Sequence, residues 1–205
     1  MTMDLSPRHL EWAASTVCGA LEPHVHEQWS TIQAGELAWD LRLTIAHVCD
    51  AVGWYAAHLA SQSTHRLPFD LRVHDDASNA DLLDVLQAAA ATLAQVARSA
   101  PPTARAYHSA GMADTSGFIA MGGDEILVHG WDALRGLQDD LHPPDALARP
   151  ILRRLFPGAP TDTPAWPTLL WANGRIELPG KAERLGPDWT WHCAPLDEWH
   201  GPSLS

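Results

Sequence analysis

The sequence predicts an all-α fold, a four-helix bundle with crossover connections that is followed by a short appendage of small helices and one strand-like segment. Three observations favour this fold class. Four long stretches carry apolar residues at helical spacing, the connections between them are uneven, and after Leu141 the chain becomes rich in proline and tryptophan. With 46% hydrophobic and 19% charged residues in 205 positions, the composition is that of a globular domain with a sizeable core.

The first two helices are predicted from their ends and their apolar stripes. The first, within residues 6–23, has Ser6 as a candidate N-cap and Pro7 at its first position. The second, within residues 39–61, carries one apolar stripe over about five turns, which a strand cannot produce. This stripe consists of Leu41, Ile45, Val48, Val52, Tyr55 and Leu59.

The third and fourth helices follow from a capping signal and from apolar content. Ser78 stands three positions before Asp81, which is the spacing of a capping box, and a pair of prolines ends this helix after residue 100. From Asp114 or Thr115 to Leu137 the sequence is apolar on nearly every side, so this helix should be central. The two glycines inside it weaken a helix and therefore predict close packing or a kink there.

The connections and the C-terminal part of the chain, here called the tail, are identified because they lack long stretches with apolar residues at helical spacing. Residues 63–77 and 101–114 are long for loops of a compact domain and could form the rim of a binding site. We divide the chain into a bundle over residues 1–141 and an appendage over residues 142–205 that packs on the bundle.

The appendage should contain three short elements. A short basic helix is expected at 146–156. Residues 163–174 form either a short helix or a hairpin that turns at Asn173 and Gly174, and the helix is favoured. The stretch "DWTWHCAPL" at 188–196 alternates tryptophans with polar residues, which indicates an extended, strand-like segment.

Charge and cysteine content exclude several classes of protein. The chain has 25 acidic and 13 basic residues and a net charge of −12, which would repel nucleic acid and anionic lipid. It shows neither a basic leader nor a run of about 20 apolar residues for a membrane span. Its three scattered cysteines favour buried free thiols over disulfides or a thiolate metal site. We expect a cytoplasmic protein that acts on a small molecule.

Two ionisable residues in the fourth helix need an explanation. Glu125 and His129 are four positions apart, so their side chains share one helix face, and that face is otherwise apolar. A buried carboxylate needs a partner, and the same face carries no Lys or Arg. The two residues could simply pair with each other, or Glu125 could accept hydrogen bonds from a Trp or Tyr in the core.

His47 adds a second imidazole that points toward the interior of the bundle. His47, Glu125 and His129 together make a ligand set suited to zinc or a similar divalent ion, and three protein ligands leave a position open for a substrate atom. Asp132, one turn beyond, could orient the imidazole of His129, or it could be a solvated residue near the end of the helix. His58 lies about 16 Å along the helix from His47 and cannot share the ion. A metal-free hydrogen-bonded core network is the alternative.

The stretches "WDLRLTIAHVCDAVGWYAAHLA" and "GGDEILVHGWDALRGL" resemble the DinB-like superfamily and, within it, the mycothiol-dependent maleylpyruvate isomerase N-terminal domain family. The resemblance covers roughly residues 5–141. It implies a four-helix bundle with a divalent metal, typically zinc, held by a His of the second helix and an E-x-x-x-H pair of the fourth. Those positions are His47, Glu125 and His129 here.

The resemblance also implies a kind of reaction. The metal would bind and ionise the thiol of a small cofactor such as mycothiol, which then adds to an electrophilic substrate in an isomerisation or a transfer. Water in the same position would give a hydrolase instead. The isomerase has a larger C-terminal domain than residues 142–205 can form, so the resemblance implies the site rather than maleylpyruvate as substrate.

We therefore expect a thiol-dependent metalloenzyme, with Trp54, Tyr55 and Trp131 as walls of its pocket. The alternative from another class is a non-catalytic binding or stress-response protein that keeps the metal for stability. The Trp-rich tail could close over the site or mediate a homodimer.

Overall fold

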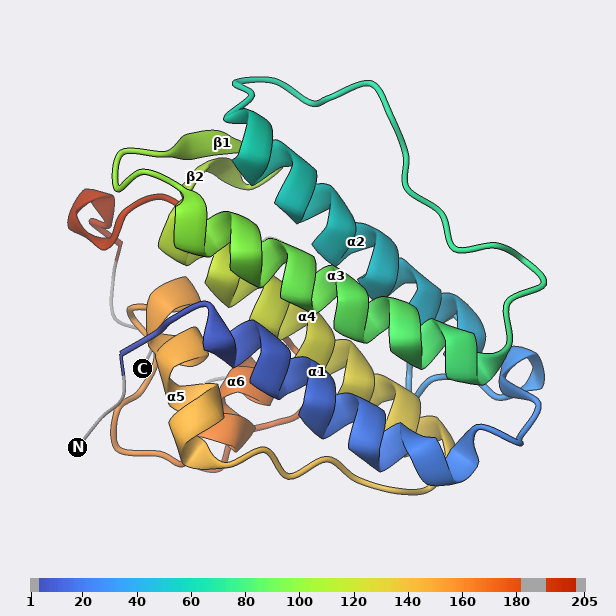
Figure 1. The fold of residues 1–205 in the computed structure, drawn as a ribbon. Helices are drawn as coiled ribbons and strands as arrows, with labels where there is room; N and C mark the ends of the chain where they lie inside the picture. Colours follow the sequence, from blue (N-terminus) through green and yellow to red (C-terminus); the bar gives the residue numbers. More distant parts are fainter. Residues whose placement is uncertain (1–3, 182–190, 202–205) are drawn as a thin grey trace.

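The computed structural model describes residues 4–181 and 191–201, and in this part of the chain the fold is all-α, as predicted. It contains six α-helices and a single two-stranded sheet (Figure 1). Short 3-10 turns form at Glu22–His24, Trp29–Thr31 and Leu196–Glu198. None of the described helices combines the length and the apolar content that crossing a bilayer needs.

The first two long helices begin close to the residues at which the sequence predicted their starts. Helix α1 spans Arg8–Leu21, and Pro7 rather than Ser6 occupies the N-cap position. The hydroxyl of Ser6 is instead within hydrogen-bond distance of the His9 ring. Helix α2 spans Leu41–Ser61 and is capped by the preceding aspartate, which accepts a hydrogen bond from a backbone N–H of the first turn.

The other two long helices also carry side-chain caps. Helix α3 spans Asn79–Ser99, and the capping box predicted for Ser78 and Asp81 is present in both directions. Helix α4 spans Thr115–Gly136, and the carboxylate of Asp114 accepts a hydrogen bond from a backbone N–H of its first turn. Most of the α4 side chains are buried, as its apolar sequence predicted.

Helix α4 packs against α1, α2, α3 and a helix of the tail, α5 (Asp145–Leu155), and α2 and α3 lie side by side (Figure 1). The two glycines of α4 make this packing close. A Cβ at Gly122 would lie 2.8 Å from Leu10 of α1 and 2.9 Å from Leu93 of α3, and one at Gly123 would lie 2.7 Å from Ile151. A larger residue at either position would have to displace these buried leucine and isoleucine side chains, which favours glycine there.

The connection between α3 and α4 corrects the sequence prediction of a loop over residues 101–114. Strands β1 (Arg105–His108) and β2 (Gly111–Asp114) pair as an antiparallel hairpin. The turn is followed by Gly111, whose φ of 135° is readily adopted only by glycine. Strands of four residues are too short for the alternation of side chains to stand out in a sequence. The other long connection, residues 63–77, contains neither helix nor strand.

The tail contains helices α5 (Asp145–Leu155) and α6 (Ala165–Ala172), so the helix predicted between 163 and 174 is confirmed over the hairpin. Helix α5 packs on α4, and α6 packs on α5. The division of the chain at residue 141 stays a prediction.

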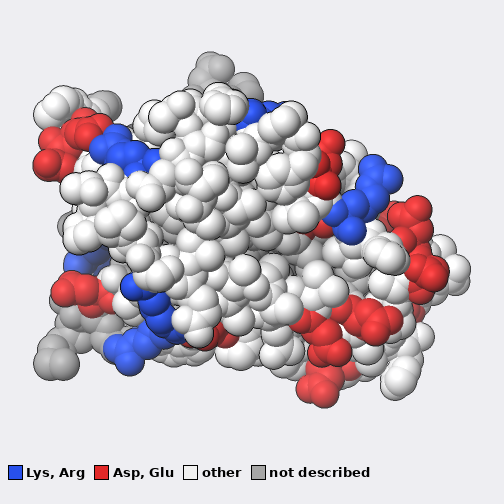
Figure 2. Space-filling view, turned by 45° about the horizontal axis from the view of Figure 1, so that its top comes forward, with Lys and Arg blue, Asp and Glu red and all other residues white. Residues whose placement is uncertain are grey.

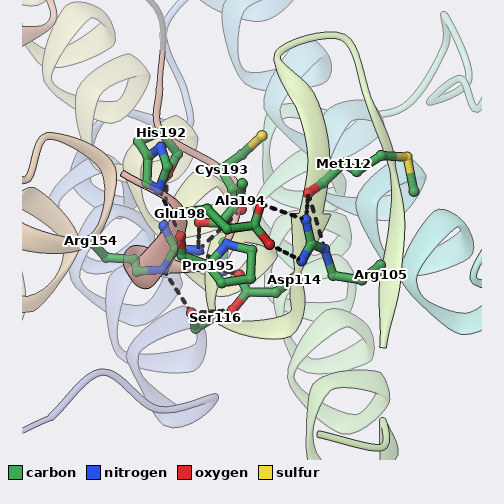
Figure 3. Close-up of polar contacts among 11 residues, drawn as sticks. Arg105, Met112, Asp114, Ser116, Arg154, His192, Cys193, Ala194, Pro195 and Glu198 are labelled. Carbon is green, nitrogen blue, oxygen red and sulfur yellow. Dashed lines mark hydrogen bonds and ion pairs between the residues drawn. The ribbon is translucent and has the colours of Figure 1, made fainter. Parts of the chain in front are cut away.

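The predicted strand-like segment at 188–196 is wrong for its described part, because residues 191–196 belong to no strand. Residues 188–190 lie outside the described residues. The physical reason is a buried guanidinium. Arg154 of α5 donates hydrogen bonds to three successive carbonyls, those of His192, Cys193 and Ala194, at 2.7, 3.1 and 2.8 Å (Figure 3). The carbonyl of Cys193 also accepts a hydrogen bond from the backbone N–H of Asp114, at 3.3 Å, so the guanidinium and this one contact with β2 satisfy the carbonyls without a regular strand pairing.

Candidate metal centre

The structure brings the three predicted ligands together. His47 comes from the middle of α2, and Glu125 and His129 come from one face of α4. One potential ligand atom of each lies within 4.8 Å of the others, and this is the only group of its kind among residues 4–181 and 191–201. Oε2 of Glu125 is 3.3 Å from Nε2 of His129 and 3.8 Å from Nε2 of His47.

Glu125 is placed so that its two carboxylate oxygens do different things. The hydroxyl of Tyr55, from α2, donates a hydrogen bond of 2.9 Å to Oε1. The other oxygen, Oε2, faces the two imidazoles. Tyr55 is therefore a core tyrosine of the kind that could stabilise Glu125 without a metal. It binds only one carboxylate oxygen, however, and the second oxygen faces the two imidazoles.

Electrostatics keep this buried carboxyl group ionised. Burial alone would raise the pKa of Glu125, but the hydrogen bond from His129, the positive charge of that imidazole, a smaller electrostatic effect of His47 and the Tyr55 hydroxyl outweigh it, and the pKa lies below its usual value. Burial and the neighbouring carboxylate raise the pKa of Tyr55, so its hydroxyl keeps the proton that it donates.

Asp132 orients His129 as the sequence suggested. Its carboxylate lies 3.1 Å from Nδ1 of His129, so Nδ1 carries a proton and Nε2 is directed to the cluster. Asp132 is itself buried and is held by the guanidinium of Arg175, at 2.9 to 3.1 Å. Arg175 follows α6, so the basic partner of Asp132 comes from the tail.

The surroundings of His129 favour a positive charge. Burial alone would lower the pKa of its imidazole, yet the carboxylates of Asp132 and Glu125 on either side raise it to about 9. A divalent cation is another positive charge that such a place would stabilise. Burial lowers the pKa of His47, which keeps this imidazole in the neutral form that binds metals.

A pocket of about 410 Å³ opens beside the cluster, and His47 and Glu125 are part of its lining. The remaining lining residues are Asp50, Ala51, Trp54, Tyr55, Arg66, Asp70, Leu71, Tyr107, His108, Ser109 and Trp191. They come from α2, from the connections on either side of α3 and from the tail. Trp54 and Tyr55 are thus pocket walls, and both connections predicted as a rim contribute to it.

Trp131 and His58 have surroundings that the sequence did not predict. Trp131 lines a different pocket, together with Asp132 and Arg175. His58 stacks on Trp54, with ring centroids 3.4 Å apart, and accepts a hydrogen bond from the backbone N–H of Leu67, so it fixes the 63–77 connection.

The three cysteines are buried free thiols, as predicted. Burial raises the pKa of Cys18 and of Cys49 to about 12, which argues against either as a nucleophile.

Four residues around the cluster or its pocket were not named as site residues from the sequence. Trp39, just before α2, has its ring centroid 4.9 Å from that of His47. Arg175, His108 and Trp191 lie in segments without a helical period, where no pattern directs attention to a single residue. Comparisons of the chain with protein-family models, characterised proteins and solved structures found no match.

Proposed function

We propose that the protein is a metal-dependent enzyme in which His47, Glu125 and His129 hold a divalent cation, zinc in the first place. The enzyme would activate a low-molecular-weight thiol of the mycothiol type for transfer to, or isomerisation of, a small electrophilic substrate. The observation that carries the proposal is the convergence of the three ligand atoms within 4.8 Å of one another at the wall of a pocket.

The donor set fits the proposed ion. Two imidazole nitrogens and one carboxylate oxygen are typical zinc ligands, and three protein ligands leave room for a further one. The cluster meets the pocket through His47 and Glu125, so a further ligand would come from that side. We also propose that α1 to α4 form the four-helix bundle with crossover connections of the DinB-like superfamily, which is supported by the origin of the ligands in the second and fourth helices.

The residues around the proposed cation would have separate roles. When bound, the cation would supply Lewis acidity that lowers the pKa of a coordinated thiol. Tyr55 orients Glu125, and Asp132 with Arg175 orients His129, so both α4 ligands have fixed directions. The pocket would receive the substrate and limit the access of water.

The charges of the surface support a small-molecule role in the cytoplasm. On the face shown in Figure 2, Lys and Arg side chains lie scattered near Asp and Glu side chains instead of forming a broad basic area. Nucleic acid and anionic membranes favour such basic areas. A homodimer formed through the tail stays a prediction.

The experiment is zinc reconstitution followed by a thiol-consumption assay. The full chain is loaded with zinc, dialysed and analysed for metal, beside Glu125→Ala and the exposed control Glu22→Ala. We expect one zinc per chain in the wild type and the control, and little in Glu125→Ala. Loss of free mycothiol in the presence of electrophiles should follow the zinc content. Equal, low zinc in all three proteins refutes the metal site, and zinc without thiol loss over a broad electrophile panel refutes the activity.

A further inference from the structure

The pocket beside the cluster has aromatic walls from three separate parts of the chain. The ring of His108, at the end of β1, lies 5.3 Å from that of Tyr55, 6.2 Å from that of Trp54 and 5.8 Å from that of Trp191. Tyr107 lies 6.4 Å from Trp54 in an edge-on arrangement. Such walls favour a flat ligand, because aromatic faces and edges pack well on a planar π-system.

Trp191 reaches this pocket because the tail is fixed. Arg154 donates to the carbonyls of the three residues that follow Trp191, and to the side chains of Asp114 and Ser116 near the start of α4 (Figure 3). The guanidinium is buried, with 4% of its side chain exposed. The tryptophan wall is therefore part of the folded site.

His108 offers a hydrogen-bond donor on the pocket side. The backbone N–H of Ala110 donates to its Nδ1 at 3.1 Å, so this nitrogen carries the lone pair. Burial lowers the pKa of the ring to about 4, so the neutral ring holds its single proton on Nε2. Among the described residues no hydrogen bond to Nε2 is formed, and the atom is not sealed from solvent. The ring lines the pocket, so this N–H is available to a ligand.

Without a metal ion, the charges of the lining disfavour an anion. Three carboxylates line the pocket, those of Asp50, Asp70 and Glu125. Its only Lys or Arg is Arg66, whose guanidinium pairs with Asp70 at 3.2 Å and is 66% exposed. An exposed, already paired guanidinium adds little to anion binding.

We propose that this pocket takes an uncharged, flat, conjugated or aromatic carbonyl compound, whose ring packs between Trp54 and Trp191 and whose carbonyl oxygen accepts a hydrogen bond from Nε2 of His108. The proposal rests on the proposed function in one respect only, that such a compound is the electrophile to which the thiol adds. It makes His108 a specificity-determining residue.

The test measures equilibrium binding of three related probes by ligand NMR, with the full chain and without any thiol. 2-Naphthamide is neutral and has a carbonyl oxygen, naphthalene lacks the acceptor, and 2-naphthalenesulfonate carries a charge but is a weak metal ligand. We expect 2-naphthamide to bind about tenfold more tightly than the sulfonate and about fivefold more tightly than naphthalene.

Variants assign the preference to His108. His108→Phe keeps a ring and removes the donor, so the fivefold preference for the amide over naphthalene should vanish. His108→Gln keeps an N–H in the place of Nε2 and should retain it. His142→Phe, at an exposed residue outside the pocket, should behave as the wild type. Near-ultraviolet circular dichroism confirms that each variant is folded, and if His108→Phe is not, Trp191→Ala must weaken the binding of all three probes.

Three results would overturn the proposal. They are sulfonate binding as tight as that of the amide, an unchanged amide preference in His108→Phe, and no binding of any probe. Because the probes need neither zinc nor a thiol, the two proposals fail separately. A chain that prefers the amide but takes up no zinc refutes the proposed function alone, and a zinc-binding chain without the preference refutes the pocket chemistry alone.

Discussion

At the scale of single residues, the proposed metal site depends on one buried aspartate that orients a ligand histidine. Asp132 is 2% exposed and lies between the imidazole of His129 and the guanidinium of Arg175. The acid could be singled out from the sequence because it follows the E-x-x-x-H pair by one turn. Its partner could not, because Arg175 comes from a segment of the tail with no periodic pattern.

The Asp132→Ala variant tests this positioning role. Without the carboxylate the ring of His129 loses its fixed direction, so zinc affinity should fall by about 10- to 100-fold. Competition with a chromogenic chelator measures the affinity, and Asp162→Ala, at a largely exposed aspartate, is the control. Equal zinc affinity in Asp132→Ala and the control would contradict the role.

The same reasoning explains which site residues sequence patterns predict. His47, Glu125 and His129 stand in long helices, where spacing fixes the face of each side chain. His108 stands in a four-residue strand, and Trp191 in an irregular segment, where spacing fixes nothing. Those side chains are brought to the pocket by tertiary contacts alone.

At the scale of the element, the tail is held by side chains more than by backbone pairing. The stretch "DWTWHCAPL" has the alternation of a strand, but three carbonyls of its described part accept hydrogen bonds from a guanidinium. Arg105 adds a second attachment, an ion pair of 2.8 Å with Glu198 (Figure 3). Alternation in a sequence cannot distinguish a strand from a segment whose carbonyls meet a buried arginine.

The Arg154→Met variant tests this attachment. It removes a charged donor from the carboxylate of Asp114 and from three tail carbonyls, so the free energy of unfolding should fall by about 3–5 kcal/mol. Urea denaturation measures it, with Arg153→Met at an exposed neighbour on the same helix as the control. An unfolding free energy equal to that of the control would show that Arg154 does not hold the tail.

At the scale of the whole molecule, the four long helices were predictable and their connections were not. The apolar stripes fix the helices and the buried nature of α4, and the glycine pair in α4 predicts close packing. The hairpin of β1 and β2 escaped prediction because its strands are short. That hairpin carries His108, so the missed element and the missed pocket residue have one cause.

Burial of His108 makes the stability of the whole fold depend on pH. Its pKa is lowered from 6.5 to about 4, so the unfolded chain binds more protons in that range, and stability falls as pH falls from 6.5 toward 4. The contribution lost between neutral pH and about pH 4.5 is about 2 kcal/mol. Urea denaturation at both pH values should show a smaller loss, by that amount, in His108→Gln than in the wild type. An equal loss in the two proteins would contradict the burial of a neutral ring.

Zinc K-edge X-ray absorption of the zinc-loaded chain, with His47→Ala beside it, tests directly whether ligands from α2 and α4 bind the same cation. The account predicts two imidazoles at about 2.0–2.1 Å from the metal in the wild type. It predicts a single imidazole in His47→Ala, because the other one belongs to His129. A wild-type spectrum without imidazole scattering, or the same imidazole number in both proteins, would contradict the claim that α2 and α4 share one cation.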